Sequence, residues 1–395
     1  MADGLAAKES LFGFDDIVAV AALFDVMFND IFFNDFFELR DKTVQLPVSG
    51  MGCSGFAAWG SATFDGRAIH GANQDLPTMG VFDRQTIVTV AKPDKGNAFL
   101  QVSFPGWFLA SGMNEAGILT SEMISTSSDT NLVENPEIPH TLHMRMIVQY
   151  TDDLEGAKEI IRNFGGAVGW NNLVTDSKTR TAVDIECSAT RMGPVYSWDD
   201  PSTPSINENQ GLCVTNQYMS CPGFRGYSGE NLTKNQMEYD DVDTSSWGTG
   251  DKYKEKWKEQ FEKYQFQNTQ SQKEVYHRAE SWYRWSRLWD LYKSRYGSIS
   301  VDDVIAFMSD TKKGPQGRAI SGASSEEKWF DGTSFPHIKG PGKAMINQGL
   351  ASVYSCVFDP ESGQKGVIWV AAGAKPAQTG VFYPIDFEEE LNKMR

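Results

Sequence analysis

Residues 52–75 read Gly-Cys-Ser-Gly-Phe-Ala-Ala-Trp-Gly-Ser-Ala-Thr-Phe-Asp-Gly-Arg-Ala-Ile-His-Gly-Ala-Asn-Gln-Asp, and the rest of the chain is organised around this stretch. Small and apolar residues alternate from Cys53 to Ala62, and a return segment follows at 67–72. Between them stands Asp-Gly at 65–66, a pair that tolerates the positive φ of a tight turn. The pattern predicts a β-hairpin, which would bring Asp75 back towards Cys53.

A cysteine directly after a glycine, at the head of a strand, indicates a specific chemistry. If the Cys53 thiol attacks the carbonyl of Gly52, the peptide bond shifts to a thioester, and water then releases Cys53 as a new N-terminal residue. Glycine lacks a Cβ and allows the close approach that this attack needs. The freed α-amine has a pKa of roughly 7.7–8.0 and can act as the base for its own thiol. We therefore expect autocleavage between Gly52 and Cys53.

Three short motifs in order carry a family resemblance: Gly-Cys-Ser at 52–54, Asn-Gln-Asp at 73–75 and Ser-Gly-Met-Asn-Glu-Ala-Gly at 111–117. The set resembles the N-terminal-nucleophile hydrolases of the acyl-coenzyme A:6-aminopenicillanate acyltransferase family, which are related to penicillin V acylases, bile salt hydrolases and N-acylethanolamine amidases. The resemblance implies an α+β fold, a four-layer αββα sandwich of antiparallel sheets with an N-terminal helical arm. It also implies cleavage of linear amide C–N bonds in a small-molecule N-acyl amide, through a thioester on Cys53.

The resemblance also implies roles for four residues. Cys53 would be the nucleophile, and Asp75 would orient its α-amine, a task comparable to that of the third member of a catalytic triad. Asn216, in Thr-Asn-Gln-Tyr at 215–218, would help to build the oxyanion hole. Arg284, in Ser-Trp-Tyr-Arg at 281–284, would support the active site.

Each of these residues has an ordinary structural alternative. A lone cysteine is often a small buried hydrophobe, an aspartate before Leu-Pro can be a turn residue, and an asparagine at a strand end can serve a turn. An arginine on a helix is usually solvated. The secondary candidates are Asn73, expected to bond local backbone, Asn114 and Glu122. Ala72 departs from the related enzymes, which carry an arginine there, and Arg84 could compensate.

Two other functions remain open at this point. The acyl group could pass to an amine or to coenzyme A, which would make the protein an acyltransferase. The chain could also be a catalytically inactive relative that acts as a binding module, an alternative that the missing arginine at Ala72 favours. The intact set of Cys53, Asp75 and Asn216 argues for an enzyme.

We expect two parts along the chain. Residues 1–52 form a helical propeptide or α-chain arm, which would stay attached to the rest after cleavage. Residues 53–395 form the catalytic domain, with a polar loop or insertion at about 226–250 and a helical segment at about 251–312. Apolar periodicity and turn residues predict helices at 14–39, 140–151, 154–164 and 300–310, and strands at 53–60, 67–72, 85–91, 99–104, 107–111, 118–122, 171–175, 181–186, 352–358 and 366–371.

Composition excludes several classes. With 395 residues and 40% hydrophobic content the chain can bury a full core. The net charge of −16, from 36 basic and 52 acidic residues, argues against a nucleic-acid partner, because binding to phosphates depends on Lys and Arg. The five cysteines and five histidines are scattered, so we expect no metal and no cofactor. A disulfide framework is not expected, although a Cys213–Cys221 bridge stays open.

The compartment and the assembly are less constrained. The apolar run at 18–28 is broken by Asp25 and flanked by acidic residues, which argues against a membrane span. The absence of a visible signal peptide favours the cytoplasm. In the family that the chain resembles, a segment like residues 1–6 lies within a longer precursor, so the localisation stays unknown. A homo-oligomer is left open.

Overall fold

A computed structural model describes residues 52–77, 86–103, 111–124, 140–164, 170–187, 192–197, 210–216, 284–285, 287–310, 350–372, 377 and 380–394. Several expectations therefore lie outside the described residues: the arm before Gly52, the polar loop at 226–250, Arg84, most of the strand at 107–111 and most of the helical segment at 251–312.

Two antiparallel sheets form the centre of the structure. The first, six-stranded sheet has the order β10-β1-β2-β11-β12-β13, and the second, seven-stranded sheet runs from β3 to β9 in chain order. The strands of the first sheet are β1 (Gly52–Gly60), β2 (Gly66–Pro77), β10 (Gly211–Val214), β11 (Leu350–Asp359), β12 (Val367–Ala372) and β13 (Tyr383–Asp386). Those of the second are β3 (Ile87–Ala91), β4 (Phe99–Ser103), β5 (Ser111–Asn114), β6 (Ile118–Ile124), β7 (Trp170–Asp176), β8 (Thr181–Cys187) and β9 (Met192–Ser197).

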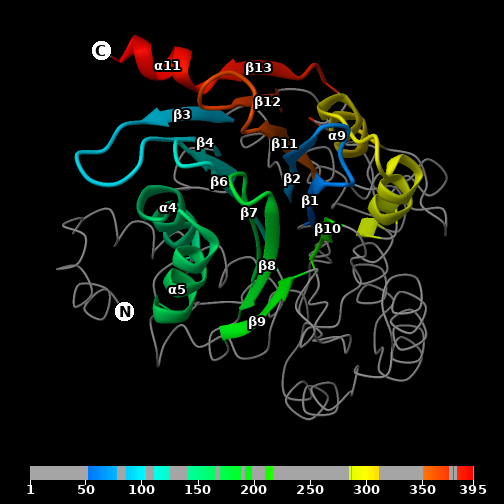
Figure 1. Ribbon diagram of the computed structural model, residues 1–395, viewed down its shortest axis with the longest axis horizontal. Coiled ribbons are helices and arrows are strands. Elements are labelled where there is room, and N and C mark those ends of the chain that lie inside the picture. The colour runs from blue at the N-terminus through cyan, green and yellow to red at the C-terminus, as the bar shows by residue number, and fades with distance from the viewer. Residues whose placement is uncertain are drawn as a thin grey trace, which may run out of the picture.

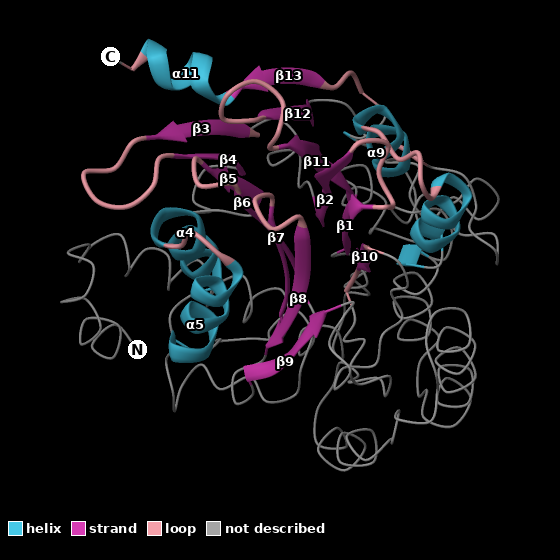
Figure 2. Cartoon of the chain, in the orientation of Figure 1, coloured by secondary structure: helices cyan, strands magenta, loops and turns pink. Residues whose placement is uncertain are grey.

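Helices cover the outer faces of both sheets (Figure 1). On the second sheet lie α4 (His140–Tyr150) and α5 (Leu154–Phe164), and on the first lie α9 (Val301–Met308) and a helix over 287–295. Figure 2 shows the same order of helix, strands and helix across the molecule, with α11 (Phe387–Lys393) at the edge beside β13. The chain is thus an α+β sandwich, and the expected αββα layering is confirmed for the described residues.

Strand β1 is buried on both faces, which explains its run of small and apolar residues. On one face Phe56 contacts the rings of Tyr292 and Phe307, at centroid distances of 6.2 and 5.4 Å. On the other face a Cβ at Gly55 would lie 2.8 Å from a Met123 side-chain atom and 3.0 Å from one of Leu173. Glycine at 55 therefore lets the two sheets approach closely, two residues from Cys53.

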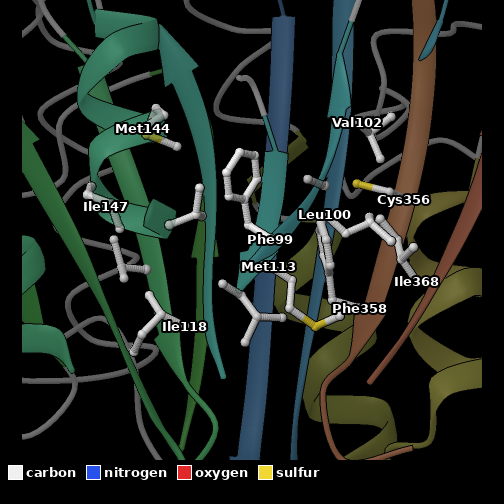
Figure 3. Close-up of a cluster of buried hydrophobic side chains, with 14 of the residues drawn as sticks. Phe99, Leu100, Val102, Met113, Ile118, Met144, Ile147, Cys356, Phe358 and Ile368 are labelled. Atoms are coloured by element: carbon white, nitrogen blue, oxygen red, sulfur yellow. The ribbon is translucent and has the colours of Figure 1, made fainter. Parts of the chain in front are cut away.

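The larger core cluster contains apolar side chains from both sheets and from α4 (Figure 3). Leu100, Val102 and Met113 of the second sheet meet Cys356 and Phe358 of the first. The helix side of the second sheet carries Phe99 and Ile118 under Met144 and Ile147 of α4. Burial on both faces of the second sheet fixes the strand register, because a slip by one residue would exchange the two faces.

Local signals predicted much of this arrangement. The first hairpin forms with Gly66 at a φ of 82°, as expected of the Asp-Gly turn. Ser300 caps α9: its side chain accepts from the Asp303 N–H, and the Asp303 carboxylate bonds the Ser300 backbone in return. Strands β9 and β13, most of β5 and helix α11 were not predicted. Within the described residues, no helix is long and apolar enough to cross a membrane.

Candidate active site

Cys53 lies at the head of β1, in the register that the hairpin prediction requires. Strands β1 and β2 pair with Gly52 opposite Asp75 and Cys53 opposite Gln74. The chain runs continuously from Gly52 into β1, so this geometry is that of the chain with the Gly52–Cys53 bond intact. The thiol is buried, with 1% of the residue exposed.

Asn216 reaches Cys53 from the neighbouring strand. Strand β10 pairs with β1, with Val214 opposite Gly55, and this pairing carries the next two residues to the head of β1. The backbone N–H of Cys53 donates to Oδ1 of Asn216 at 2.6 Å. Nδ2 of Asn216 donates to the carbonyl of Ile124 at 2.8 Å. In the continuous chain, Asn216 therefore acts as an acceptor towards the backbone nitrogen of Cys53, which cleavage of the Gly52–Cys53 bond would turn into an α-amine.

Arg284 is fully buried in the same cluster. Its Nη1 donates to the carbonyl of Cys53 and, at 3.0 Å, to Oγ of Ser54. Its Nη2 donates to Oδ1 of Asn216 at 2.7 Å. The alternative of a solvated surface arginine is wrong, because the buried guanidinium donates hydrogen bonds to Cys53, Ser54 and Asn216.

Asp75 lies opposite Gly52 on β2, and its buried carboxylate accepts a hydrogen bond from Oγ of Ser352 on β11. The two residues are also paired in the sheet. Asp75 is therefore a fixed carboxylate at the same end of the sheet as Cys53. The alternative of a turn residue is wrong, since Asp75 lies within β2.

Burial raises the pKa of the Cys53 thiol to about 12. The negative charges of Asp75 and Glu122 add to this increase, while a backbone hydrogen bond from Asp75 and the charge of Arg284 oppose it. At neutral pH the thiol of the continuous chain is therefore protonated. A base beside the sulfur, or a new positive charge there, is needed to make it a nucleophile.

The secondary candidates Asn73 and Asn114 serve the packing of the fold. Asn73 donates to the carbonyl of Met308 at 2.9 Å and accepts from Oγ of Ser355 at 2.6 Å, so the expectation of purely local bonding is wrong. Nδ2 of Asn114 donates to two carbonyls at the end of α4, and Oδ1 accepts from the N–H of Ile118. Through these hydrogen bonds the Asn114 side chain connects the end of α4 to the second sheet.

Glu122 lies on the opposite face of its sheet from Cys53. Strand alternation puts Met123, which contacts the position of Gly55, on the inner face and Glu122 on the face covered by α4. There its Oε2 lies 3.2 Å from Nε2 of His140. Glu122 therefore influences the thiol through its charge and lies outside the cluster around Cys53.

Sequence reasoning missed two polar residues of this region, Ser54 and Ser352. Both are fully buried in strands, and each hydrogen-bonds a predicted site residue. A serine within an apolar strand was the available signal.

Ala72 is buried on β2 opposite Cys356 and Gly55. Among the described residues, no group of His, Cys, Asp or Glu side chains could hold a metal ion, and Cys213 is a buried thiol.

No protein-family profile matches this chain. An uncharacterized protein from Archaeoglobus fulgidus is 30% identical over 150 residues, which are 37% of this chain and 25% of that protein. The match thus spans about a quarter of the relative's length.

Several solved structures share an overall likeness with the chain, each over 85% of its length. A mutant of the conjugated bile acid hydrolase from Clostridium perfringens has a TM-score of 0.45 at 13% identity over 93% of that chain. The ortholog of N-acylethanolamine-hydrolyzing acid amidase from Caenorhabditis elegans has a TM-score of 0.43 at 12% identity over 100% of that chain. The penicillin V acylase from Agrobacterium tumefaciens has 0.40 at 11% over 87%. At these values we infer no activity from the likeness, and the chemistry of the site rests on its own geometry.

Proposed function

We propose that this protein is a self-processing amidase of the N-terminal-nucleophile type, with Cys53 as both nucleophile and base. The observation that carries the proposal is the convergence of Asn216 and Arg284 on the backbone of Cys53. A buried strand residue needs one acceptor for its backbone N–H, but it needs no buried arginine that bonds both that acceptor and its carbonyl. An N-terminal nucleophile does need such a fixed environment, because its backbone nitrogen becomes the catalytic amine.

Processing would proceed in two steps. The sulfur of Cys53 bonds to the carbonyl carbon of Gly52, the C–N bond breaks, and the nitrogen of Cys53 takes up the thiol proton. Water then attacks the thioester, leaving a carboxylate on Gly52 and a free thiol and α-amine on Cys53. The preceding segment would leave as a light piece of about 5.8 kDa (52/395 of 43.9 kDa), or stay bound as an arm.

Turnover of an N-acyl amide would use the same atoms. The α-amine takes the thiol proton, and the thiolate attacks the carbonyl carbon of the substrate. The resulting oxyanion collapses, the C–N bond breaks, and the α-ammonium gives its proton to the leaving amine. Water, deprotonated by the α-amine, then releases the acid and restores the thiol.

The surrounding groups have distinct tasks in this proposal. Oδ1 of Asn216 orients the α-amine, and Nδ2 carries a second hydrogen that can donate to the oxyanion. The charge of Arg284 favours the thiolate, since it already lowers the pKa of Cys53 against the effect of burial. The carboxylate of Asp75 favours a protonated α-amine once the thiol has given up its proton.

Intact mass spectrometry tests the proposal without knowledge of a substrate. We expect two masses for the wild-type protein, separated at the Gly52–Cys53 bond, and one full-length mass for Cys53→Ala. Cys187→Ala is the matched control, because Cys187 is a buried thiol on β8, and it should be cleaved like the wild type. An active protein that keeps a single full-length mass would sink the mechanism.

The acceptor of the acyl group separates a hydrolase from an acyltransferase. Adding amines to the mature protein during turnover should leave the acid as the product if water alone reaches the Cys53 thioester. Formation of new amides at millimolar amine would instead make acyl transfer the main activity.

A further inference from the structure

Three neighbouring strands present Cys53, Gln74 and Tyr354 as one row across the first sheet. Gln74 of β2 is paired with Cys53 of β1 on one side and with Tyr354 of β11 on the other. All three are buried, with exposed fractions of 1%, 3% and 0%. Directly opposed residues of antiparallel strands point to the same face, with Cβ atoms about 4.5–5.5 Å apart. Gln74 is therefore the direct cross-strand neighbour of Cys53, on the same face of the sheet.

A β-bulge in β11 puts Tyr354 in this row. The pairing passes from Ser352 opposite Asp75 to Tyr354 opposite Gln74, which leaves Val353 as an extra residue. In a regular ladder Val353 would oppose Gln74, and Tyr354 would point to the other face of the sheet. The bulge thus allows Ser352 to bond Asp75 on one face while the phenol of Tyr354 turns to the face of the thiol.

This face is turned towards the second sheet, inside the sandwich. The hydroxyl of Tyr354 lies 3.2 Å from Oγ of Ser111 on β5. Burial raises the pKa of Tyr354 well above its usual value, and charges at Cys356, Glu122 and Cys53 add to the shift. The phenol and the thiol are therefore close enough to interact electrostatically.

Gln74 is buried and carries two N–H donors and one acceptor. An acyl group that packs against this side chain without polar atoms would leave the amide unbonded, at a cost of about 1–3 kcal/mol. In the precursor, the acyl group presented to Cys53 is the peptidyl group ending in Gly52, which is paired with the next residue of β2, Asp75. That acyl group carries an amide nitrogen on its α-carbon.

We propose that Gln74, with Tyr354 beside it, forms a polar subsite for the α-substituent of the acyl group, so that the substrates are aminoacyl or peptidyl amides rather than amides of plain hydrocarbon acids. This inference rests on the proposed function and names the substrate class of the same site. A hydrocarbon chain next to the carbonyl would leave the Gln74 amide facing methylene groups, whereas an α-amido group can bond it.

Two matched acyl donors test the subsite: the p-nitrophenyl esters of N-acetylglycine and of pentanoic acid. Their acyl chains have the same number of chain atoms and differ in one amide group. The sulfur of Cys53 bonds to the acyl carbon, the ester C–O bond breaks, p-nitrophenolate leaves with the electron pair, and the thiol proton goes to the α-amine. Release of p-nitrophenolate from mature protein gives the rate, intact mass locates the adduct, and free cysteine supplies the intrinsic reactivity ratio of the two esters.

We expect the wild-type protein to favour the N-acetylglycyl ester at least about tenfold over pentanoyl, relative to free cysteine, which is the typical effect of one hydrogen bond. Gln74→Met should remove that preference, and Tyr354→Phe should reduce it. Gln101→Met is the matched control, because Gln101 is a buried glutamine on β4. It shares a strand face with Phe99, whose ring lies under Arg145 of α4, so it points away from Cys53. Gln101→Met should keep the wild-type ratio.

The outcomes separate the two proposals. Acylation of Cys53 by neither ester removes the nucleophile and the subsite together. Acylation by both esters without preference in the wild type keeps the amidase and overturns the subsite. A preference that survives in Gln74→Met overturns the assignment to Gln74, and an equal loss of both rates in that variant makes its role structural.

Discussion

The backbone N–H of Cys53 donates a hydrogen bond of 2.6 Å to Oδ1 of Asn216, although 163 positions separate the two residues in the chain. Asn216 also accepts from Arg284 and donates to the carbonyl of Ile124. The Asn216 side chain therefore makes three hydrogen bonds in the continuous chain. Its orientation makes it a holder of the Cys53 nitrogen, a role that the sequence pattern did not indicate.

Replacing Asn216 separates its acceptor and donor roles. Asn216→Ala loses both and should lower the turnover number by about 10²–10³, with little change in the Michaelis constant, because the oxyanion bond forms mainly in the transition state. Asn216→Asp keeps an acceptor for the Cys53 nitrogen and loses the Nδ2 donor. Steady-state kinetics check both variants.

If Asn216 donates to the oxyanion, Asn216→Asp should be nearly as slow as Asn216→Ala. If it only holds the amine, Asn216→Asp should keep most of the activity. Wild-type kinetics in Asn216→Ala would remove the residue from the site altogether.

Asp75→Asn should leave the fold intact and slow processing, turnover or both, because the α-amine loses the nearby negative charge that favours its protonated form. General acid–base catalysis contributes about 10²–10⁴ in rate, which sets the upper limit of the loss. Intact mass over time gives the rate of processing. Steady-state kinetics give the rate of turnover. Asp302→Asn, at an exposed position of α9, is the control. If Asp75→Asn processes and turns over at the same rates as Asp302→Asn, Asp75 has no part in the chemistry.

Arg284→Met should destabilise the protein. The substitution deprives the Cys53 carbonyl, Ser54 and Asn216 of a charged donor, and one hydrogen bond to a charged group is worth about 1.5–3 kcal/mol. Urea unfolding measures the decrease in the free energy of unfolding. Arg295→Met replaces a mostly exposed arginine near Asp303 and should cost less than about 1 kcal/mol. Equal effects of the two substitutions would contradict the buried role of Arg284.

Asp184→Asn should change how stability depends on pH. Asp184 is fully buried on β8. Burial and then the charge of Glu186 raise its pKa well above the usual value, against the opposing effect of the backbone N–H of Asn172. The folded state thus holds the proton more tightly than the unfolded state, so this group costs stability as the pH rises above its unfolded pKa of about 3.9.

The free energy of unfolding of Asp184→Asn, relative to wild type, should therefore increase between pH 4 and pH 7, since an amide does not titrate. Urea unfolding at several pH values measures this difference. Asp302→Asn should show no such trend. A constant difference between Asp184→Asn and wild type over this range would mean that the carboxyl has an ordinary pKa.

The sequence by itself determined the local elements, because their signals act over a few residues. The β1–β2 connection has positive φ at Gly60 and at Gly66, and the Asp-Gly pair indicated the second of these. The capping box of α9 spans Ser300 to Asp303. Alternation and turn spacing likewise predicted the β1–β2 hairpin and hence the approach of Asp75 to Cys53. The family resemblance added Asn216 and Arg284 to the candidates without saying which atoms would meet.

Only the tertiary structure decided which groups surround Cys53. Arg284 and Asn216 are 231 and 163 positions from Cys53, and no local pattern records contacts over such separations. A one-residue bulge in β11 sets the partners of Asp75 and Gln74, and such a shift leaves no clear mark in the sequence although it reverses the face of every following side chain. Glu122 was a secondary candidate because its strand was expected near the site. It faces α4, since the packing of the two sheets decides which face of a strand is turned inward.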